Sequence, residues 1–260
     1  MRIIVCVKQV PDTTEVRIDP KTNTLIRQGV PSIVNPYDKY ALEAALTLRE
    51  QAGGTVTVLS MGPQQALSAL RECLAMGADE AILLSDRFFG GADTLATSHT
   101  LAAAIRKIGD YDIIFCGMQA IDGDTAQVGP EIAEHLGIAQ ATYAMNITYA
   151  QNKLLIEQQT DEGSQLLEAG LPVLITTTKA LKTPRYMTVA GIMQAFSRDI
   201  PVWGADRLEV DREMLGLKGS PTQVRRIFVP ERKGKGDVFT GDPHTAVEAL
   251  LEKLQQLKIV

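Results

Sequence analysis

The feature that most constrains the fold is a pattern repeated through the first half of the chain, in which a short apolar run precedes an amphipathic stretch. Apolar runs occupy residues 3–7, 55–59, 81–84 and 113–116, and helical spacing occurs at 40–51, 64–76 and 94–108. Continuous apolar runs are typical of strands covered on both faces, as in a parallel sheet. The alternation of strands and helices therefore predicts an α/β fold with a doubly wound, mainly parallel sheet.

Two hairpins and one further strand complete the expected sheet region. Residues 16–27, with a polar tip at 19–24, and residues 144–159, which turn at 151–152, have the pattern of two strands joined by a short loop. Residues 173–176 supply another buried apolar run. We expect the hairpins to be insertions in the α/β fold.

The pattern changes at residue 182, after which prolines and glycines divide the chain into short segments. We expect residues 1–181 to form the α/β domain, and residues 182–260 to form an extended, partner-wrapping arm that ends in an amphipathic helix at 245–257. Residues 182–235 carry eleven Lys or Arg against six Asp or Glu, although the whole chain has a net charge of −5. This basic segment is a partner surface or an anion contact, or it is only a solvated loop region.

Composition excludes several classes of protein. Of the 260 residues, 45% are hydrophobic and 22% are charged, which is ordinary for a folded globular chain. The apolar run at residues 3–7 is too short for the core of a signal peptide, and no apolar stretch approaches the roughly 18 residues of a membrane span. We therefore expect a cytoplasmic protein. Cys6, Cys73 and Cys116 are too few and too widely spaced for a disulfide framework or a thiolate zinc site. The acidic chain also lacks a nucleic-acid-binding motif.

Three loops fall where an open α/β sheet binds its ligands, beyond the carboxyl ends of the strands and near helix N-termini. Residues 35–38 combine a capping residue, Asn35, with Pro36 at the first helical position. This loop is either a ligand contact or a plain helix start. Residues 60–63 turn at Gly62, which lets the backbone approach a ligand, although this signal is weak alone.

The third loop, residues 117–131, is the strongest candidate for a ligand site. It places glycines and polar side chains before a helix whose first turn contains Pro130. Unpaired N–H groups at such a helix start suit a phosphate or a pyrophosphate. The loop matches neither G-x-x-x-x-G-K-[ST] nor G-x-G-x-x-G. An alternative interpretation is that Asp122 and Asp124 bind a metal ion. No histidine lies nearby in the sequence, however, and the spacing is not that of an EF-hand.

Acid, base and nucleophilic catalysis find little support in the sequence. His99, His135 and His244 lie on or near predicted helices, and none is beside an evident Ser or Cys nucleophile. We therefore predict no catalytic residue, and favour a nucleotide or cofactor that carries the reaction.

At these residues the chain resembles the β subunits of electron-transfer flavoproteins. The resemblance covers essentially the whole chain and rests on motifs at residues 5–12, 35–38, 60–63, 75–79, 119–124 and 184–186. It implies a Rossmann-like fold of the adenine-nucleotide-binding type and a heterodimer with an α subunit that carries FAD. In this family the β subunit holds AMP or, in the electron-bifurcating branch, a second FAD that accepts a hydride from NADH.

Residues 123–131 and 85–97 are similar to the bifurcating branch, so we expect FAD in this subunit; AMP would replace it in a non-bifurcating member. The expected cofactor contacts are Cys6, Asn35, Pro36, Tyr37, Asp38, Met61, Asp122, Gly123, Asp124, Thr125, Ala126, Gln127, Val128, Gly129, Pro130 and Ala133. The expected NADH contacts are Phe89, Gly90, Gly91, Ala92, Asp93 and Thr94. Alternatively, Phe88 and Phe89 only pack this loop.

The resemblance also implies a docking loop. Residues 185–193 are similar to a segment that inserts into an acyl-CoA dehydrogenase, with contacts from Tyr186, Val189, Ile192 and Met193. Val189 would be the apolar anchor. Residues 194–198 depart from the lysines found in many relatives, which leaves the identity of this flavin dehydrogenase open.

The resemblance therefore implies a bifurcating β subunit. One electron from NADH would go to ferredoxin or flavodoxin, and the other would pass through the α-subunit FAD to the dehydrogenase. One alternative is a β subunit with AMP, which serves as a structural and docking module. Another is a free-standing ATP-binding regulatory module, which does not explain the long segment after Lys182.

Overall fold

A computed structural model describes residues 1–12, 31–151, 153–225 and 236–260 of the chain. Its main sheet has nine strands in the order β11-β5-β4-β1-β6-β10-β7-β8-β9. The strands are β1 (Arg2–Cys6), β4 (Thr55–Met61), β5 (Glu80–Leu84), β6 (Ile113–Gly117), β7 (Ala139–Ala150), β8 (Lys153–Thr160), β9 (Gly163–Ala169), β10 (Val173–Thr177) and β11 (Val202–Trp203). All neighbours from β11 to β7 pair in parallel, and only β7-β8 and β8-β9 are antiparallel. The predicted α/β fold with a mainly parallel sheet is confirmed.

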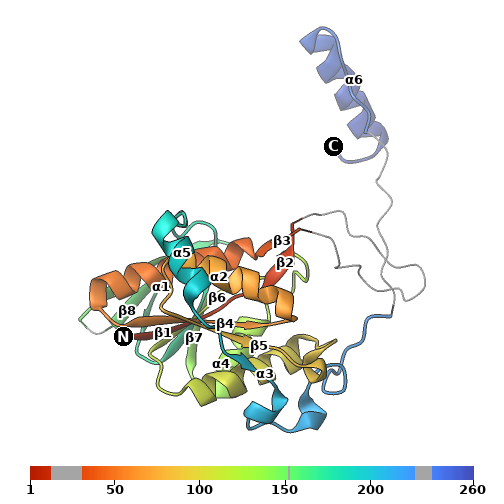
Figure 1. The fold of residues 1–260 in the computed structure, drawn as a ribbon. Helices are drawn as coiled ribbons and strands as arrows, with labels where there is room; N and C mark the ends of the chain where they lie inside the picture. The colour runs from red at the N-terminus through yellow and green to blue at the C-terminus, as the bar shows by residue number, and fades with distance from the viewer. Residues whose placement is uncertain (13–30, 152, 226–235) are drawn as a thin grey trace. The chain divides into compact units, whose positions relative to one another are not determined.

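Helices cover both faces of this sheet (Figure 1). The α-helices are α1 (Pro36–Ala52), α2 (Leu67–Met76), α3 (Thr94–Ile108), α4 (Val128–Leu136), α5 (Val189–Ser197) and α6 (Pro243–Gln256). Short 3-10 turns lie at Gln64–Ala66, Arg87–Phe89, Ala205–Arg207 and Arg212–Met214. A separate antiparallel pair joins β2 (Gln9–Pro11) to β3 (Ser32–Val34).

Two apolar layers follow from the alternation of side chains along each strand. Ile3 and Val5 of β1 pack in the layer that holds the buried leucines of α1 and α2. Ile4 and Cys6 pack in the opposite layer with α3 and α4. The continuous apolar runs in the sequence are therefore explained, because both faces of the parallel strands are buried.

The second predicted hairpin is present as β7 and β8, and β9 extends it by one strand that the sequence pattern did not indicate. The first, at residues 16–27, lies outside the described residues. None of the helices that the structure describes is both long and apolar enough to cross a membrane.

The first part of the segment expected to form an arm packs on the α/β core. Residues 1–225 make up one compact unit, and residues 226–260 make up another. Val202 and Trp203 pair with Leu83 and Leu84 as an extra edge strand, and Ala195 of α5 is buried in the core layer of α1 and α2. The assignment of nucleotide binding to residues 1–181 and of partner contact to residues 182–260 stays a prediction.

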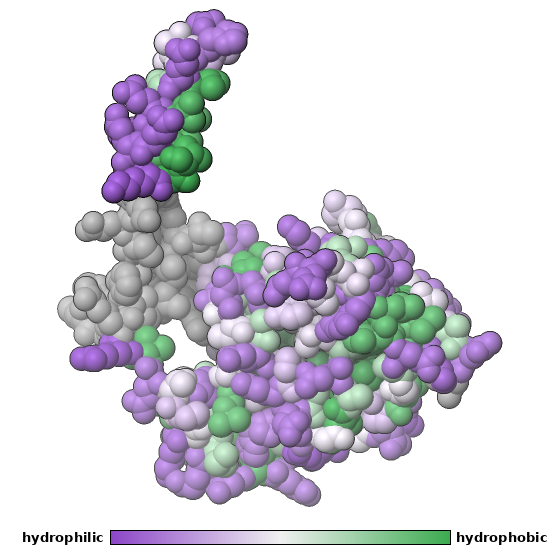
Figure 2. Space-filling model, turned by 180° about the vertical axis from the view of Figure 1, so that it is seen from behind, coloured by the Kyte–Doolittle hydropathy of each residue, from purple (hydrophilic) through white to green (hydrophobic). Residues whose placement is uncertain are grey.

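The second unit contains the predicted C-terminal helix, α6. Asp242 caps it by accepting hydrogen bonds from the backbone N–H groups of His244 (3.0 Å) and Thr245 (3.3 Å). Val247, Leu250 and Leu251 are exposed along one side of the helix. Figure 2 shows a continuous apolar stripe there. A stripe of this kind is typical of a helix that packs against another surface.

Candidate functional site

The loops that follow β1, β3 and β6 meet at one corner of the sheet, at the start of α1. Asn35 joins them, because its side-chain amide donates to the backbone oxygen of Gln119 (2.8 Å) and accepts from the N–H of Ile121 (3.2 Å). Asn35 is almost fully buried. The first and third predicted corners therefore form one site, and Asn35 fixes the start of the 119–127 loop.

Asp38 is the centre of a second set of hydrogen bonds at this corner. Its carboxylate accepts from the N–H of Lys8 (2.7 Å), the N–H of Gly117 (3.2 Å) and the side chain of Asn35 (2.9 Å). Burial raises the pKa of Asp38 to about 7, although these hydrogen bonds lower it in part. The side chain connects α1 to the ends of β1 and β6.

Position 117 has room only for a glycine, because α1 lies against the end of β6 there. A Cβ atom at this position would lie 2.3 Å from Oδ1 of Asp38 and 2.7 Å from the carbonyl carbon of Tyr37. Contacts this short do not occur between real side chains and backbone, so any larger residue would separate β6 from the start of α1. The close approach of strand and helix brings the two loops together.

The loop from Ile121 to Gln127 has an unusual backbone. Asp124 and Ala126 have φ angles of 56° and 54°, in the left-handed region that non-glycine residues rarely adopt. Such conformations cost about 1–3 kcal/mol each and cluster at ligand sites. The next residue, Gln127, has a right-handed helical backbone conformation. When the backbone changes from left-handed to right-handed between successive residues, their N–H groups can bind one anion together.

The predicted carboxylates of this loop both have partners. Nζ of Lys8 lies 2.6 Å from Oδ1 of Asp122, and the side-chain amide of Gln119 donates to Asp124. Within the described ranges, no group of three or more His, Cys, Asp or Glu side chains could hold a metal ion. Lys8 is a cation at this site that the sequence-based prediction did not include among the cofactor contacts.

Helix α4 begins directly after this loop and packs tightly on the sheet. Among the described residues no side chain caps its first turn, so the N–H groups of Val128 and Gly129 have neither an intrahelical acceptor nor a capping side chain. Pro130 has no N–H group to satisfy. A Cβ atom on Gly129 would lie 2.7 Å from Cγ2 of Thr176, so glycine lets α4 approach β10.

The remaining predicted cofactor contacts lie at or beneath this corner. Cys6 and Cys116 are register partners on β1 and β6, and both are buried. The hydrogen bond with Cys6, together with burial, raises the pKa of the Cys116 thiol well above its ordinary value, so this thiol stays neutral. Ala133 is fully buried in the apolar layer under α4. The residues that the structure brings together are therefore Asn35, Asp38 and the 117–130 loop.

Ser60 was absent from the predicted contacts. It is fully buried at the carboxyl end of β4, next to Met61, and its hydroxyl has no hydrogen-bond partner among the described residues. A buried unpaired hydroxyl is uncommon, which makes Ser60 a candidate contact for a bound group. The sequence signal was the turn at residues 60–63, but only the structure shows that the hydroxyl is unpaired.

The predicted NADH loop adjoins the start of α4. Oγ1 of Thr94 lies 3.0 Å from Oε1 of Glu131 and 3.5 Å from Oε1 of Gln127. Asp93 caps α3 through the N–H of Ala96 (3.1 Å). The two predicted binding loops are therefore neighbours.

Two members of this loop have clear packing roles. Phe89 is only 5% exposed and belongs to the apolar layer of α3 and α4, which agrees with the packing alternative for this side chain. Gly91, at φ 73°, lies against Leu217. Phe88 instead is exposed, and the guanidinium groups of Arg87 and Arg212 lie 5.3 Å and 5.1 Å from its ring centroid.

His99 and His135 pack against each other between α3 and α4, with ring centroids 5.4 Å apart. Burial, followed by the positive charges nearby, lowers the pKa of His99. Neither Nε2 atom has a hydrogen-bond partner in the described part of the chain. The pair lies in a helix interface, away from the corner loops.

The predicted docking residues form an exposed apolar surface on and before α5. Tyr186, Val189 and Met193 are 94%, 77% and 71% exposed, and Ile192 is partly exposed. Phe196, which was not predicted, adds to this surface. Thr188 caps α5 by accepting from the N–H of Gly191 (2.9 Å). Such an apolar surface on a folded unit is typical of a protein-binding site.

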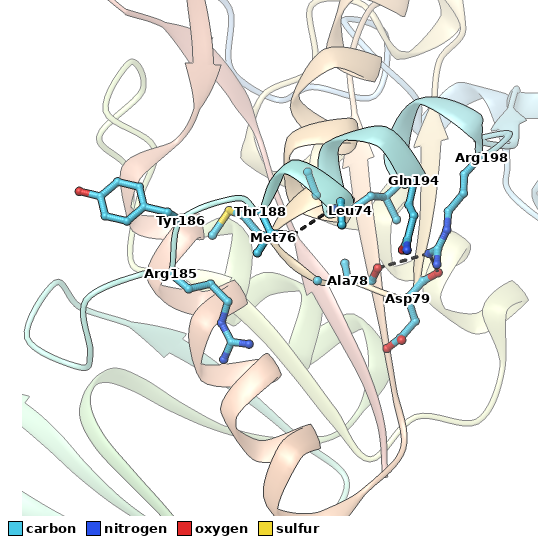
Figure 3. A pocket seen from close by; sticks show the side chains of 13 residues that line it. Leu74, Met76, Ala78, Asp79, Arg185, Tyr186, Thr188, Gln194 and Arg198 are labelled. Carbon is cyan, nitrogen blue, oxygen red and sulfur yellow. Dashed lines mark hydrogen bonds between the residues drawn. The ribbon is translucent and has the colours of Figure 1, made fainter.

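A pocket of about 410 Å³ lies between α5, the residues that precede it and the end of α2. Figure 3 shows Arg185 and Arg198 at opposite ends of this pocket, with the Tyr186 ring turned away from it. A second pocket, of about 740 Å³, is lined by Tyr37 and Met118 at the corner and by Tyr143 and Gln158 of the β7-β8 hairpin.

Comparisons with known proteins find relatives of this chain along its whole length. Residues 22–208 match the family described as "Electron transfer flavoprotein domain". The chain is 56% identical over 256 residues to the "Electron transfer flavoprotein subunit beta" of Clostridium acetobutylicum, covering 98% of both chains. It is 52% identical to the "Caffeyl-CoA reductase-Etf complex subunit CarD" of Acetobacterium woodii and 46% identical to the "Acryloyl-CoA reductase electron transfer subunit gamma" of Anaerotignum propionicum. Both of these matches cover the full length of both chains.

Proposed function

The chain belongs to the electron transfer flavoprotein family as a β subunit, and from this premise we propose that it binds FAD and takes part in electron bifurcation. The observation that carries the proposal is the contact of two loops, through Thr94, Gln127 and Glu131. One loop has the features of a phosphate site. The other supplies a neighbouring surface for a second dinucleotide.

The residues at the corner fit a dinucleotide. The uncapped start of α4 and the alternating backbone at Ala126 and Gln127 direct N–H groups toward an anion. The unpaired hydroxyl of Ser60 offers a further polar contact. We infer that residues 122–130 hold the diphosphate, with Cys6, Asn35, Tyr37 and Met61 toward the adenosine end.

When bound, FAD would accept a hydride from NADH and release the electrons singly, one to ferredoxin or flavodoxin and one to a dehydrogenase through the α-subunit FAD. The chain's own residues have the tasks of binding and orientation. Asn35 and Asp38 fix the loops at the corner. Residues 89–94 would position NADH, with Thr94 linking them to the start of α4.

Two surfaces are assigned to proteins. The apolar stripe of α6, in the unit formed by residues 226–260, would pack on the α subunit. Residues 186–197, termed the docking segment below, would contact an acyl-CoA dehydrogenase or a related flavin dehydrogenase. Two relatives support a partner of this kind, since one is named as a subunit of a caffeyl-CoA reductase-Etf complex and the other as an electron transfer subunit of acryloyl-CoA reductase.

The alternative is AMP at the same corner. An adenosine monophosphate would use the same N–H groups and Ser60, and the subunit would then be a structural and docking module. We favour FAD because the contact between the two loops would bring a flavin held at residues 122–130 next to the loop proposed to position NADH.

The test is the nucleotide content of the complex purified with its α subunit. After heat denaturation, chromatography of the supernatant would give two FAD per heterodimer, and NADH would bleach a flavin band of the native complex. One FAD and one AMP per heterodimer would refute FAD binding in this subunit and support the alternative.

A further inference from the structure

We propose that Glu43 is a positioning residue for electron delivery: through Arg185, it fixes the orientation of the docking segment relative to the α/β core. This inference rests on the docking function proposed above. It adds a determinant outside the contact surface, at a position of α1 for which the sequence analysis predicted no role.

Glu43 is a carboxylate buried under the start of the docking segment. Its side chain is only 3% exposed. Arg185 surrounds it: the backbone N–H donates to Oε2 (3.0 Å), Nε donates to Oε2 (2.8 Å) and Nη2 donates to Oε1 (3.0 Å). Three bonds from one residue fix both the guanidinium and the backbone at position 185.

The pKa shifts of Glu43 and Arg185 are those of a close ion pair. Burial alone would raise the pKa of Glu43, but the hydrogen bonds and charge of Arg185 outweigh burial and hold this pKa below its ordinary value. The same bonds raise the pKa of Arg185. Lys182 adds a more distant positive charge, 3.6 Å from Oε1 of Glu43. The carboxylate is therefore ionised, and removing its charge would leave the N–H groups of Arg185 that face it without a charged acceptor.

The docking segment has two further points of attachment. A Cβ atom on Gly191 would lie 2.4 Å from the backbone oxygen of Ala75, so glycine lets α5 rest on the end of α2. After the segment, Nη1 of Arg198 donates to the backbone oxygens of Asp79 (2.6 Å) and Ala78 (3.5 Å). Figure 3 shows Arg198 next to these two residues. The exposed apolar side chains thus project from a backbone held at both ends.

A surface held in its binding orientation loses less conformational entropy on association than a flexible one does. If Glu43 loses its charge, the start of the segment gains freedom, and the dehydrogenase must order it on binding. The expected effect is a higher KM for the dehydrogenase, while kcat at saturation stays the same because the bound geometry is unchanged.

The experiment compares Glu43→Gln with Glu50→Gln in the complex purified with its α subunit. Glu50 is the matched control, because it also contacts Arg185, through Nη1, but its side chain is 52% exposed. The assay follows electron transfer from the NADH-reduced complex to a purified short-chain acyl-CoA dehydrogenase at varied concentration. Val189→Glu first establishes whether this dehydrogenase binds the docking segment.

We expect E43Q to raise the KM about tenfold, as for the loss of one hydrogen bond between charged groups, with kcat and flavin content unchanged. E50Q should change KM by less than about twofold, as exposed ion pairs do. Adding Arg185→Gln to E43Q should raise KM little further, since both changes break the same pair. Amide hydrogen exchange at residues 186–197 should be faster in E43Q only.

Three results would overturn the inference. The first is an unchanged KM in E43Q when V189E is impaired, and the second is an equal rise in KM in E43Q and E50Q. The third is a fall in kcat without a change in KM. If V189E itself transfers electrons as the wild type does, the docking function fails, and this failure is distinguishable because it does not involve Glu43.

Discussion

Replacing Gly117 by alanine tests whether the corner depends on the close approach of β6 to α1. The new Cβ would lie 2.3 Å from Oδ1 of Asp38 and 2.7 Å from the carbonyl carbon of Tyr37. Both neighbours are held in place, because Asp38 is buried and bonded to Lys8 and Asn35. The strand and the helix must therefore separate, or Asp38 must leave its partners.

The cost follows from two contributions. Overpacking of a dense interior costs about 1–3 kcal/mol. Loss of the bond from the Gly117 N–H to Asp38 adds about 1 kcal/mol. A total of about 2–4 kcal/mol would lower the Tm by about 5–15 °C for a chain of this size. Because the same displacement moves the 119–127 loop, the purified complex should also retain less nucleotide.

Differential scanning calorimetry and nucleotide analysis of the purified complex provide the measurement. Gly170→Ala is the matched control, since Gly170 lies outside the corner and its Cβ would have no atom of the described residues within 4 Å. G170A should unfold within about 1 °C of the wild type, as surface substitutions usually do. If G117A and G170A have the same Tm and nucleotide content, the close approach does not determine the site.

Three further predictions concern Asp38, His99 and the docking segment. Because burial raises the pKa of Asp38 from 3.8 to about 7, the folded state binds this proton more tightly than the unfolded state. The resulting stability is complete below about pH 4 and is lost as the pH rises toward 7, so Asp38→Asn should flatten that part of the Tm profile in scanning calorimetry. The pKa of His99 is lower in the folded protein than its value of 6.5 in the unfolded chain. The folded state therefore favours the neutral imidazole, and the free energy of unfolding should fall as the pH drops below 6.5. His99→Gln should weaken that acid sensitivity in pH-dependent denaturant unfolding, and an unchanged profile would contradict the assignment. Val189→Glu should reduce electron transfer to the dehydrogenase in the coupled assay and leave flavin content intact, whereas loss of flavin as well would contradict a pure docking role.

The central strands could be predicted because burial on both faces gives continuous apolar runs, which few other structures produce. Strand β9 was missed for the opposite reason. It is an edge strand with a largely exposed surface, and its Leu166 is exposed, so its sequence has neither a continuous run nor a clean alternation. Helix α5 was read as part of a loop, because its glycine and β-branched residues are weak helix formers. Its contact with α2 outweighs that preference.

The corner loops could be located from the sequence, since glycines and a proline mark the helix starts. Their contacts could not be predicted, because Asn35 and Asp38 bond to residues about 80 positions away, at 117, 119 and 121. Lys8 and Ser60 fall within the motifs at 5–12 and 60–63, but the sequence does not show that the Lys8 side chain reaches the 117–131 loop or that the Ser60 hydroxyl is buried. The strain at Asp124 and Ala126 is likewise a property of the backbone alone.

Edge strand β11 has a consequence for how this protein could diversify. It follows the docking segment directly, and its Val202 and Trp203 are bound to the sheet through β5. The side chains at positions 186, 189, 193 and 196 are exposed, so under the proposed docking role substitutions there would change the partner without changing the cofactor. Selection could therefore adapt one electron-transfer unit to successive dehydrogenases by altering a few surface side chains, while the redox chemistry inherited by each descendant stays the same.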